Sequence, residues 1–392
     1  MKRESFIATH VKDVPPSGIR KFFDIASGMK DAISLGVGEP DFVTPWNIRE
    51  SAIFSIEKGM THYTSNYGTI KLRRLISKYL DMRFSLSYDP EKQILVTVGA
   101  SEALDLCFRA VIDPGDEVLI PAPSYVSYMP SVTFANGVPV AMECFEEDEF
   151  KLRPEAIEKA VTEKTKAIVL PFPNNPTGAI MTLDDYREIV DIIVKHDLFV
   201  ISDEIYSELT YSGRHVSIAE FPEIYDRCVV INGFSKSFAM TGFRLGYAAG
   251  PEEVIKAIVK IHQYSMLCAP TVSQVAGEEA LSYEMDTNFA QVKKMRDSYN
   301  RRRLFLNKAL NDMGLHCFEP KGAFYMFPNI ASTGLTSQEF CTRLIKEKRV
   351  ACVPGDAFGE SGEGFIRCSY ASSMQNLTEA VKRMKAFLDE LK

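Results

Sequence analysis

The sequence lacks the long apolar stretches that mark membrane proteins. Its 392 residues include no run of about 18 apolar residues, the length that a membrane-spanning helix needs. The N-terminus, MKRESFIATHVKDVPP, has no apolar core of the length found in signal peptides. We therefore expect a cytoplasmic protein that does not bind membranes.

Patterns for metal binding and for disulfides are also missing. The eight cysteines include no CxxC pair, and the six histidines are scattered without the spacing of metal ligands. In a reducing compartment such cysteines rarely form disulfides. We expect no metal site and no disulfide, with most cysteines packed in the core.

Positive charge is too scarce for a protein that binds nucleic acid. The formal net charge is -7, so the chain offers no basic surface to a phosphate backbone. No GxGxxG motif follows a predicted strand, which argues against a dinucleotide-dependent dehydrogenase. We expect small-molecule substrates and no nucleic-acid partner.

The composition and pattern that are present indicate an α/β protein. Hydrophobic residues make up 46% of the chain and charged residues 25%, as in globular proteins. From about residue 46 to 281, apolar strands alternate with helical stretches, which predicts a doubly wound, mostly parallel sheet with helices on both faces. One strand, over residues 244–249, is expected to be antiparallel.

The C-terminal part predicts a second, smaller α/β unit. A long helix is expected from about residue 283 to 313, with short strands at 323–327, 350–353 and 365–369 after it. We therefore expect three parts: an N-terminal segment (1–45) packed on the small domain, a large domain (46–285) and a small C-terminal domain (286–392).

One lysine lies in a segment suited to covalent catalysis. Lys236 is part of GFSKSFAMTGFRLGYAAG, with Ser235 before it and Arg244 after it. A lysine that loses its proton forms a Schiff base with an aldehyde, and pyridoxal 5'-phosphate (PLP) is the cofactor held in this way. Such a cofactor also needs donors for its phosphate, an anion at its pyridine nitrogen and a donor to its phenolic oxygen.

The sequence has a candidate for each of these contacts. Asp203 follows the apolar run 198–202, so its carboxylate should emerge at the carboxyl end of a buried strand, where ligands bind in α/β sheets. Asn175 follows another such strand and could donate its amide to the phenolic oxygen. The turn Gly99-Ala100-Ser101 opens a helix, whose free N–H groups suit a phosphate. Each residue alone could be an ordinary turn or surface residue, and only their joint occurrence favours the cofactor site.

Nine motifs along the chain point to one family. They are ISLGVGEPDF from Ile33, THYTSNYG from Thr61, TVGASEAL from Thr97, PAPSYVSY from Pro121, NNPTG from Asn174, SDEIY from Ser202, GFSKSFAMTGFRLG from Gly233, KGAFYMFP from Lys321 and GEGFIRCSY from Gly362. With these motifs the chain resembles the class I/II aminotransferases of the fold-type I PLP enzymes. Within them it looks most like the branch of aromatic, aspartate or alanine, and N-acetyl-diaminopimelate aminotransferases.

The resemblance implies a role for residues in most of these motifs. Lys236 would bind the cofactor and move the substrate proton, and Asp203 would pair with the pyridinium nitrogen. Asn175 and Tyr206 would hold the phenolic oxygen, while Tyr125 would stack on the ring, where many relatives have Trp. The phosphate ligands would be Gly99, Ala100, Ser101, Ser235, Arg244 and Tyr63 of the partner subunit.

The resemblance also implies the substrates. Arg367, Asn175 and the backbone of Gly38 would hold the α-carboxylate, because a guanidinium matches a carboxylate in bidentate geometry. The expected enzyme is a homodimer with shared active sites that moves the amino group of an L-amino acid to a 2-oxo acid by a ping-pong mechanism. Aromatic or small neutral donors and 2-oxoglutarate as acceptor are expected.

Two alternatives stay open on the sequence. A PLP-dependent β-lyase or synthase on the same fold would keep almost every residue named above, because fold and cofactor do not fix the reaction. A non-catalytic PLP-binding regulator is the other, although such a regulator needs a DNA-binding module and the chain has no room for one before Ile33.

Overall fold

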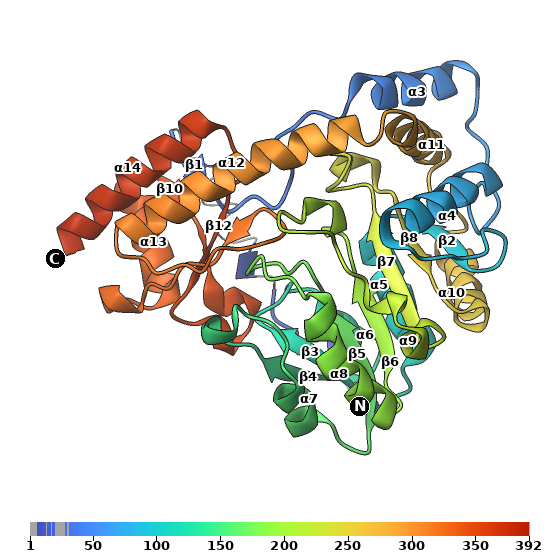
Figure 1. Cartoon of the computed structure of the whole chain (residues 1–392), viewed down its shortest axis with the longest axis horizontal. Helices are drawn as coiled ribbons and strands as arrows, with labels where there is room; N and C mark the ends of the chain where they lie inside the picture. The colour runs from blue at the N-terminus through green and yellow to red at the C-terminus, as the bar shows by residue number, and fades with distance from the viewer. Residues whose placement is uncertain (1–5, 13, 17, 20–27, 30, 392) are drawn as a thin grey trace.

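The computed structural model describes residues 6–12, 14–16, 18–19, 28–29 and 31–391. Its central feature is a seven-stranded sheet (Figure 1). In spatial order the strands are β2 (Ile94–Thr97), β8 (Gly246–Ala249), β7 (Cys228–Gly233), β6 (Phe199–Asp203), β5 (Thr165–Leu170), β3 (Glu117–Ala122) and β4 (Val138–Glu143). Strand β8 is antiparallel to both of its neighbours, as predicted, and all other pairs are parallel.

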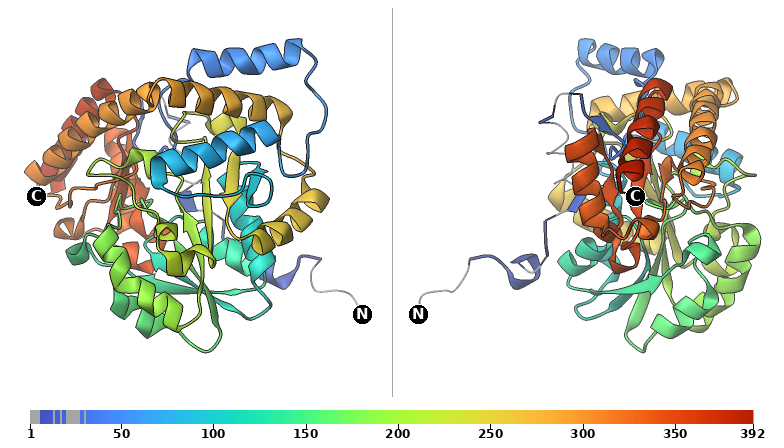
Figure 2. Two further views of the ribbon diagram at one scale, coloured as in Figure 1. Left: turned by 45° about the vertical axis from the view of Figure 1, so that its right-hand side comes forward. Right: turned by 90° about the vertical axis from the view of Figure 1, so that its left-hand side faces the viewer.

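Helices cover both faces of this sheet (Figures 1 and 2). One face packs on α5 (Ala100–Val111), α6 (Tyr128–Phe134) and α10 (Glu252–Ser265). The other packs on α4 (Ile70–Phe84), α7 (Pro154–Ala160), α8 (Leu183–Lys195), α9 (Pro222–Tyr225) and α11 (Thr271–Asp286), and α3 (Trp46–Glu57) packs against α11. Because side chains alternate along a strand, Val200 lies in one core and Ile201 in the other. The predicted doubly wound α/β fold is confirmed.

A third core lies in the C-terminal part of the chain. It is built from α12 (Ala290–Asp312), α13 (Ser337–Lys348), α14 (Met374–Leu391) and a three-stranded sheet of β11 (Val353–Pro354), β12 (Ile366–Ser369) and β9 (Tyr325–Met326). Strand β1 (Ile33–Ser34) pairs in parallel with β10 (Val350–Ala351), so part of the N-terminal segment lies against this core. The domain boundaries at residues 45 and 285 stay predictions, and part of the segment 1–45 lies outside the described residues.

Short helical turns complete the fold. Helix α1 (Thr9–Lys12) precedes the first strand, and the 3-10 helices are η1 (Glu146–Asp148), η2 (Ser207–Leu209), η3 (Ile218–Glu220), η4 (Thr241–Phe243), η5 (Ala331–Thr333), η6 (Gly355–Phe358) and η7 (Glu360–Gly362).

The helix predicted from about residue 283 to 313 is in fact the end of α11 and the whole of α12. Asn288 and Phe289, between them, have φ angles of 54° and 58°. A continuous right-handed helix cannot contain two left-handed residues. Figure 1 shows α12, in orange, running from this turn beside α11 to the C-terminal core. The strand predicted over 350–353 is likewise divided at Cys352 into β10 and β11.

No helix in the described ranges is long and apolar enough to cross a membrane, and no three His, Cys, Asp or Glu side chains there gather as metal ligands. All eight cysteines are free thiols, and every one except Cys268 is buried. The cytoplasmic location stays a prediction.

Candidate active site

A cavity of about 1150 Å³ opens at the carboxyl ends of the central strands. Parallel α/β sheets place their ligand sites at this edge. Most of the residues predicted for the site line this cavity, namely Gly38, Ala100, Ser101, Tyr125, Asn175, Asp203, Tyr206, Ser235, Lys236, Arg244 and Arg367. Gly99 lies directly beneath Arg244, whereas Tyr63 lies on the surface, 82% exposed.

Asp203 is the last residue of β6 and is almost completely buried. Its carboxylate accepts a hydrogen bond from the hydroxyl of Tyr128 at 2.8 Å and one from the backbone N–H of Ile205 at 3.2 Å. Burial raises the pKa of Asp203 to about 6, and these two hydrogen bonds oppose the rise. A carboxylate desolvated in this way is stabilised when a cation binds against it.

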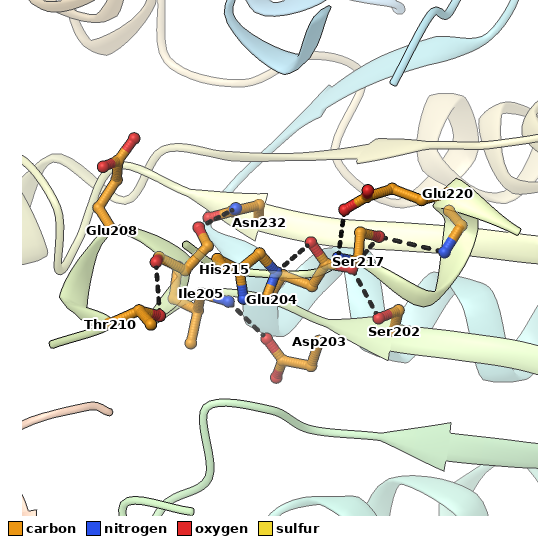
Figure 3. Close-up of polar contacts among 12 residues, drawn as sticks. Ser202, Asp203, Glu204, Ile205, Glu208, Thr210, His215, Ser217, Glu220 and Asn232 are labelled. Atoms are coloured by element: carbon orange, nitrogen blue, oxygen red, sulfur yellow. Dashed lines mark hydrogen bonds and ion pairs between the residues drawn. The ribbon is translucent and has the colours of Figure 1, made fainter. Parts of the chain in front are cut away.

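A buried polar network fixes the chain just after Asp203 (Figure 3). One oxygen of Glu204 accepts from the hydroxyls of Ser202 at 2.8 Å and Ser217 at 2.5 Å, and the other lies 2.9 Å from Nε2 of His215. All four side chains are buried. The network therefore holds the segment that carries Asp203 and the N–H of Ile205. The motif SDEIY contains Glu204, but the sequence alone gave it no role.

Lys236 projects into the same cavity from the loop after β7. Its Nζ donates to the carbonyl oxygen of Gly38 at 2.5 Å and lies 5.8 Å from the centre of the Tyr206 ring. Burial lowers the pKa of Lys236 to about 8; Glu39 opposes the shift, and Arg367 adds to it. A part of this lysine is therefore neutral near pH 7, and a neutral amine is both a nucleophile and a base.

The N-terminus of α5 and Arg244 lie close together beside the cavity that Lys236 lines. The first N–H groups of a helix have no acceptor within the helix, and its dipole makes that end positive. Gly99, the N-cap, has a φ of 79°, and a Cβ there would lie 2.6 Å from Nη2 of Arg244. Only glycine thus lets the guanidinium approach the helix end. Ser101 and Ser235 also line the cavity, and residues of these types suit a phosphate.

Arg367 is a buried guanidinium, 2% exposed, on β12. It donates to the side-chain oxygen of Asn175 at 2.8 Å and to the carbonyl oxygen of Gly36 at 2.6 Å, and it lies over the ring of Tyr325. Both of these acceptors are neutral oxygens, and Nε of Arg367 has no hydrogen-bond partner among the described residues. A buried charge without a counter-ion is costly, so this group is built to receive an anion.

Three further side chains complete the walls. Because Asn175 accepts from Arg367 through its oxygen, its amide NH₂ is free to donate into the cavity. The hydroxyls of Tyr206 and Tyr325 lie 2.9 Å apart. Tyr125 meets Tyr128 edge-on, with ring centres 5.7 Å apart. Tyr128 and Tyr325 were missed on the sequence, because nothing in their spacing shows that folding brings them to Asp203 and Arg367.

Comparisons with known proteins show the family to which the chain belongs. The profile of the family described as aminotransferase class I and II matches residues 30–384. A putative aminotransferase of Bacillus subtilis is 51% identical over 384 residues, 98% of each chain, and an aspartate aminotransferase of Pyrococcus abyssi is 48% identical over 380 residues, 97% of each. The crystal structure of an aromatic aminotransferase from Pyrococcus horikoshii superposes with a TM-score of 0.90 at 46% identity, covering 94% of this chain and 99% of that one. The chain therefore belongs to the class I and II aminotransferases and, as its motifs indicated, is an enzyme that transfers amino groups.

Proposed function

We propose that this aminotransferase uses PLP to move the amino group of an L-amino acid to a 2-oxo acid, with 2-oxoglutarate as acceptor, in a ping-pong sequence. The observation that carries the proposal is Arg367, a buried cation that lacks an anionic partner among the described residues and faces the cavity of Lys236 and Asp203. Amino acids and 2-oxo acids share an α-carboxylate, so one arginine serves both half-reactions.

The side chains around the cavity fit PLP in their chemistry. Arg244 and the N-terminus of α5 suit a phosphate dianion, because a Cβ at Gly99 would close the approach that glycine leaves open. Asp203, buried beside Tyr128, suits a protonated ring nitrogen, and the free amide of Asn175 suits a phenolic oxygen. When bound, PLP supplies an aldehyde for covalent attachment and a ring that takes up the electrons of the Cα–H bond.

Arg367, Lys236 and Asp203 then have separate roles in the reaction. Arg367 holds the α-carboxylate and so orients the Cα–H bond toward Lys236. Nζ of Lys236 would accept the Cα proton and return it at the carbon that the aldehyde of PLP contributes. Its lowered pKa of about 8 suits it to this role. Asp203, held by Tyr128 and the N–H of Ile205, stays ionised against the ring cation.

The preference for one substrate side chain over another depends on whether the cavity has a cation without another role. Lys236, Arg244 and Arg367 are the Lys and Arg residues among the described residues of the cavity lining, and each has a role above. None remains for a side-chain carboxylate close to Cα, while Val14, Ile19 and other apolar side chains line the cavity. The relatives named above act on aspartate and on aromatic amino acids by their names, so they leave the choice open.

We therefore expect phenylalanine, tyrosine and alanine to be better donors than aspartate. Burial of an aromatic ring contributes about 2 kcal/mol, enough for a preference of roughly thirtyfold. Steady-state kcat/KM for the four donors, with 2-oxoglutarate as acceptor, measures this directly. A value for aspartate above all three others would contradict the substrate proposal while leaving the amino transfer intact.

The same assay separates transamination from the lyase alternative. A transaminase forms a new 2-oxo acid only when an acceptor is present, and it releases no ammonia. Ammonia formed without an acceptor would identify a β-lyase instead.

We also propose a homodimer with shared active sites. Tyr63 is 82% exposed, and its loop lies against the loop of Met266 and Leu267, since Asn66 donates to the carbonyl oxygen of Leu267 at 2.7 Å. Tyr264, three residues before Leu267 in the chain, is 86% exposed as well. A surface of this kind favours association, and a partner subunit seated there would place Tyr63 at the other phosphate site.

Mixing two variants that each alter one half of the proposed shared site tests this arrangement. In a hybrid of Lys236→Ala and Tyr63→Ala subunits, shared sites give one fully wild-type site and one doubly altered site. Activity should therefore rise when the variants are refolded together, and sedimentation of the wild type should give a dimer. No recovery, or an active monomer at assay concentration, would contradict the proposal.

A further inference from the structure

A second cavity, of about 240 Å³, lies behind the catalytic lysine. The segment directly after Lys236 forms one wall, and the end of α11 with the first turns of α12 forms another. Its lining includes Phe42, Ser237, Phe238, Glu284, Gln291 and Met295. It shares no lining residue with the active-site cavity in the described part of the chain, so it is a separate space.

Three polar atoms in this lining have no hydrogen-bond partner among the residues that the structure describes. They are Oε1 of Glu284, Oε1 of Gln291 and Oγ of Ser237. Glu284 is 1% exposed and Ser237 2% exposed, so bulk water does not solvate these two side chains. Buried polar atoms left unpaired cost free energy, and three around one space indicate an occupant.

The unpaired atoms are hydrogen-bond acceptors, so a ligand that fits them must donate hydrogen bonds. The other oxygen of Glu284 is already used, because it accepts from the backbone N–H of Val292 at 3.4 Å. The amide nitrogen of Gln291 donates to the side-chain oxygen of Asn47 at 3.3 Å, which leaves its oxygen free. A carboxylate oxygen and an amide oxygen can only accept, and the hydroxyl of Ser237 can do so too.

The remaining walls of the cavity are mostly apolar, so they fit an apolar part of a ligand. Phe42, Phe238, Val292 and Met295 surround the polar atoms. One water takes up about 30 Å³ in the liquid, so water alone would fill the space with several molecules against an apolar wall. Lys294 also lines the cavity, but its side chain is exposed to solvent. Burial raises the pKa of Glu284, because desolvation disfavours the charged carboxylate. A cation bound beside it would offset that cost.

We propose that this cavity binds an organic ammonium ion with a small apolar body. Its N–H groups donate to Oε1 of Glu284, Oε1 of Gln291 and Oγ of Ser237, and its apolar part packs on Phe42, Phe238 and Met295. Charge complementarity at Glu284 selects the ammonium over a neutral molecule of the same shape.

Calorimetric titration of the holoenzyme at pH 8 with 2-phenylethylammonium chloride tests the site, with 2-phenylethanol as the neutral probe of similar shape. The ammonium should bind and the alcohol should not. Glu284→Gln keeps the shape of the side chain and removes its charge, so affinity should fall at least about tenfold. The control is Asp286→Asn, which removes a charge from an exposed side chain on the same helix and should bind like the wild type.

Ser237→Ala provides a second variant, with an expected loss of about threefold to tenfold, should Glu284→Gln fail to fold. Equal affinity in the wild type and both cavity variants would place the probe elsewhere and overturn the proposal. No binding to the wild type, or equal binding of the alcohol, would overturn it as well and leave the cavity to water.

Discussion

Lys236→Ala should lower turnover by at least about 10⁴-fold, because it removes both the covalent attachment point and the base that moves the Cα proton. No other lysine among the described residues lines the cavity, so no neighbour can take over. The measurement is kcat with saturating donor and acceptor. A loss of less than about a hundredfold would contradict the assignment.

Two further readouts separate a chemical role of Lys236 from a structural one. A small primary amine added to Lys236→Ala should restore part of the turnover, because it can enter the space that the side chain leaves. Borohydride reduction of the wild-type holoenzyme, followed by peptide mapping, should find the cofactor on Lys236. Label on a different lysine would contradict the proposed attachment.

How far the sequence predicts this site depends on where each residue lies in the chain. Asp203 could be placed because an apolar strand ends at it, and parallel strands end at one edge of a sheet. Gly99 and Arg244 could be matched to motifs, but the close approach between them, which requires glycine, follows only from the fold. The roles assigned to these residues stay proposals.

Contacts between distant segments could not be predicted in the same way. Tyr128 binds Asp203 across 75 positions of the sequence, and Tyr206 meets Tyr325 across 119. Neither pair has a periodicity that a sequence shows. The turn at Asn288 and Phe289 was missed because apolar residues recur at helical spacing on both sides of it. That same turn brings Glu284 to the second cavity, so the second site was also invisible in the sequence.

Asp203→Asn should slow turnover by at least about a hundredfold, since an amide cannot hold a proton on the ring nitrogen as a carboxylate does. The variant keeps the size of the side chain and can still accept from Tyr128, so its fold should be unchanged. Single-turnover rates of Cα proton removal measure the effect. A loss below about tenfold would contradict the pairing.

The cofactor-free protein gives an independent test of Asp203 through pH. The pKa of this carboxyl, about 6 in the folded protein, lies above its ordinary value of 3.8, so the folded state binds the proton more tightly than the unfolded chain does. This stabilisation is complete below about pH 4 and is lost as the pH rises through 6. Above that pH the free energy of unfolding of the apoprotein is lower by about 3 kcal/mol than in acid, because the pKa shift is about two units and each unit corresponds to roughly 1.4 kcal/mol.

Asp203→Asn has no such titration. Its thermal stability relative to the wild-type apoprotein should therefore increase between about pH 4 and pH 6 and become level above that range. The exposed residue Asp226 provides the control, because Asp226→Asn should show no such trend. Addition of PLP at pH 8 should make the wild type more stable than Asp203→Asn, since a ring cation stabilises the carboxylate but not the amide. A stability difference that is independent of pH would mean that Asp203 is not the desolvated carboxylate on which the proposed pairing depends.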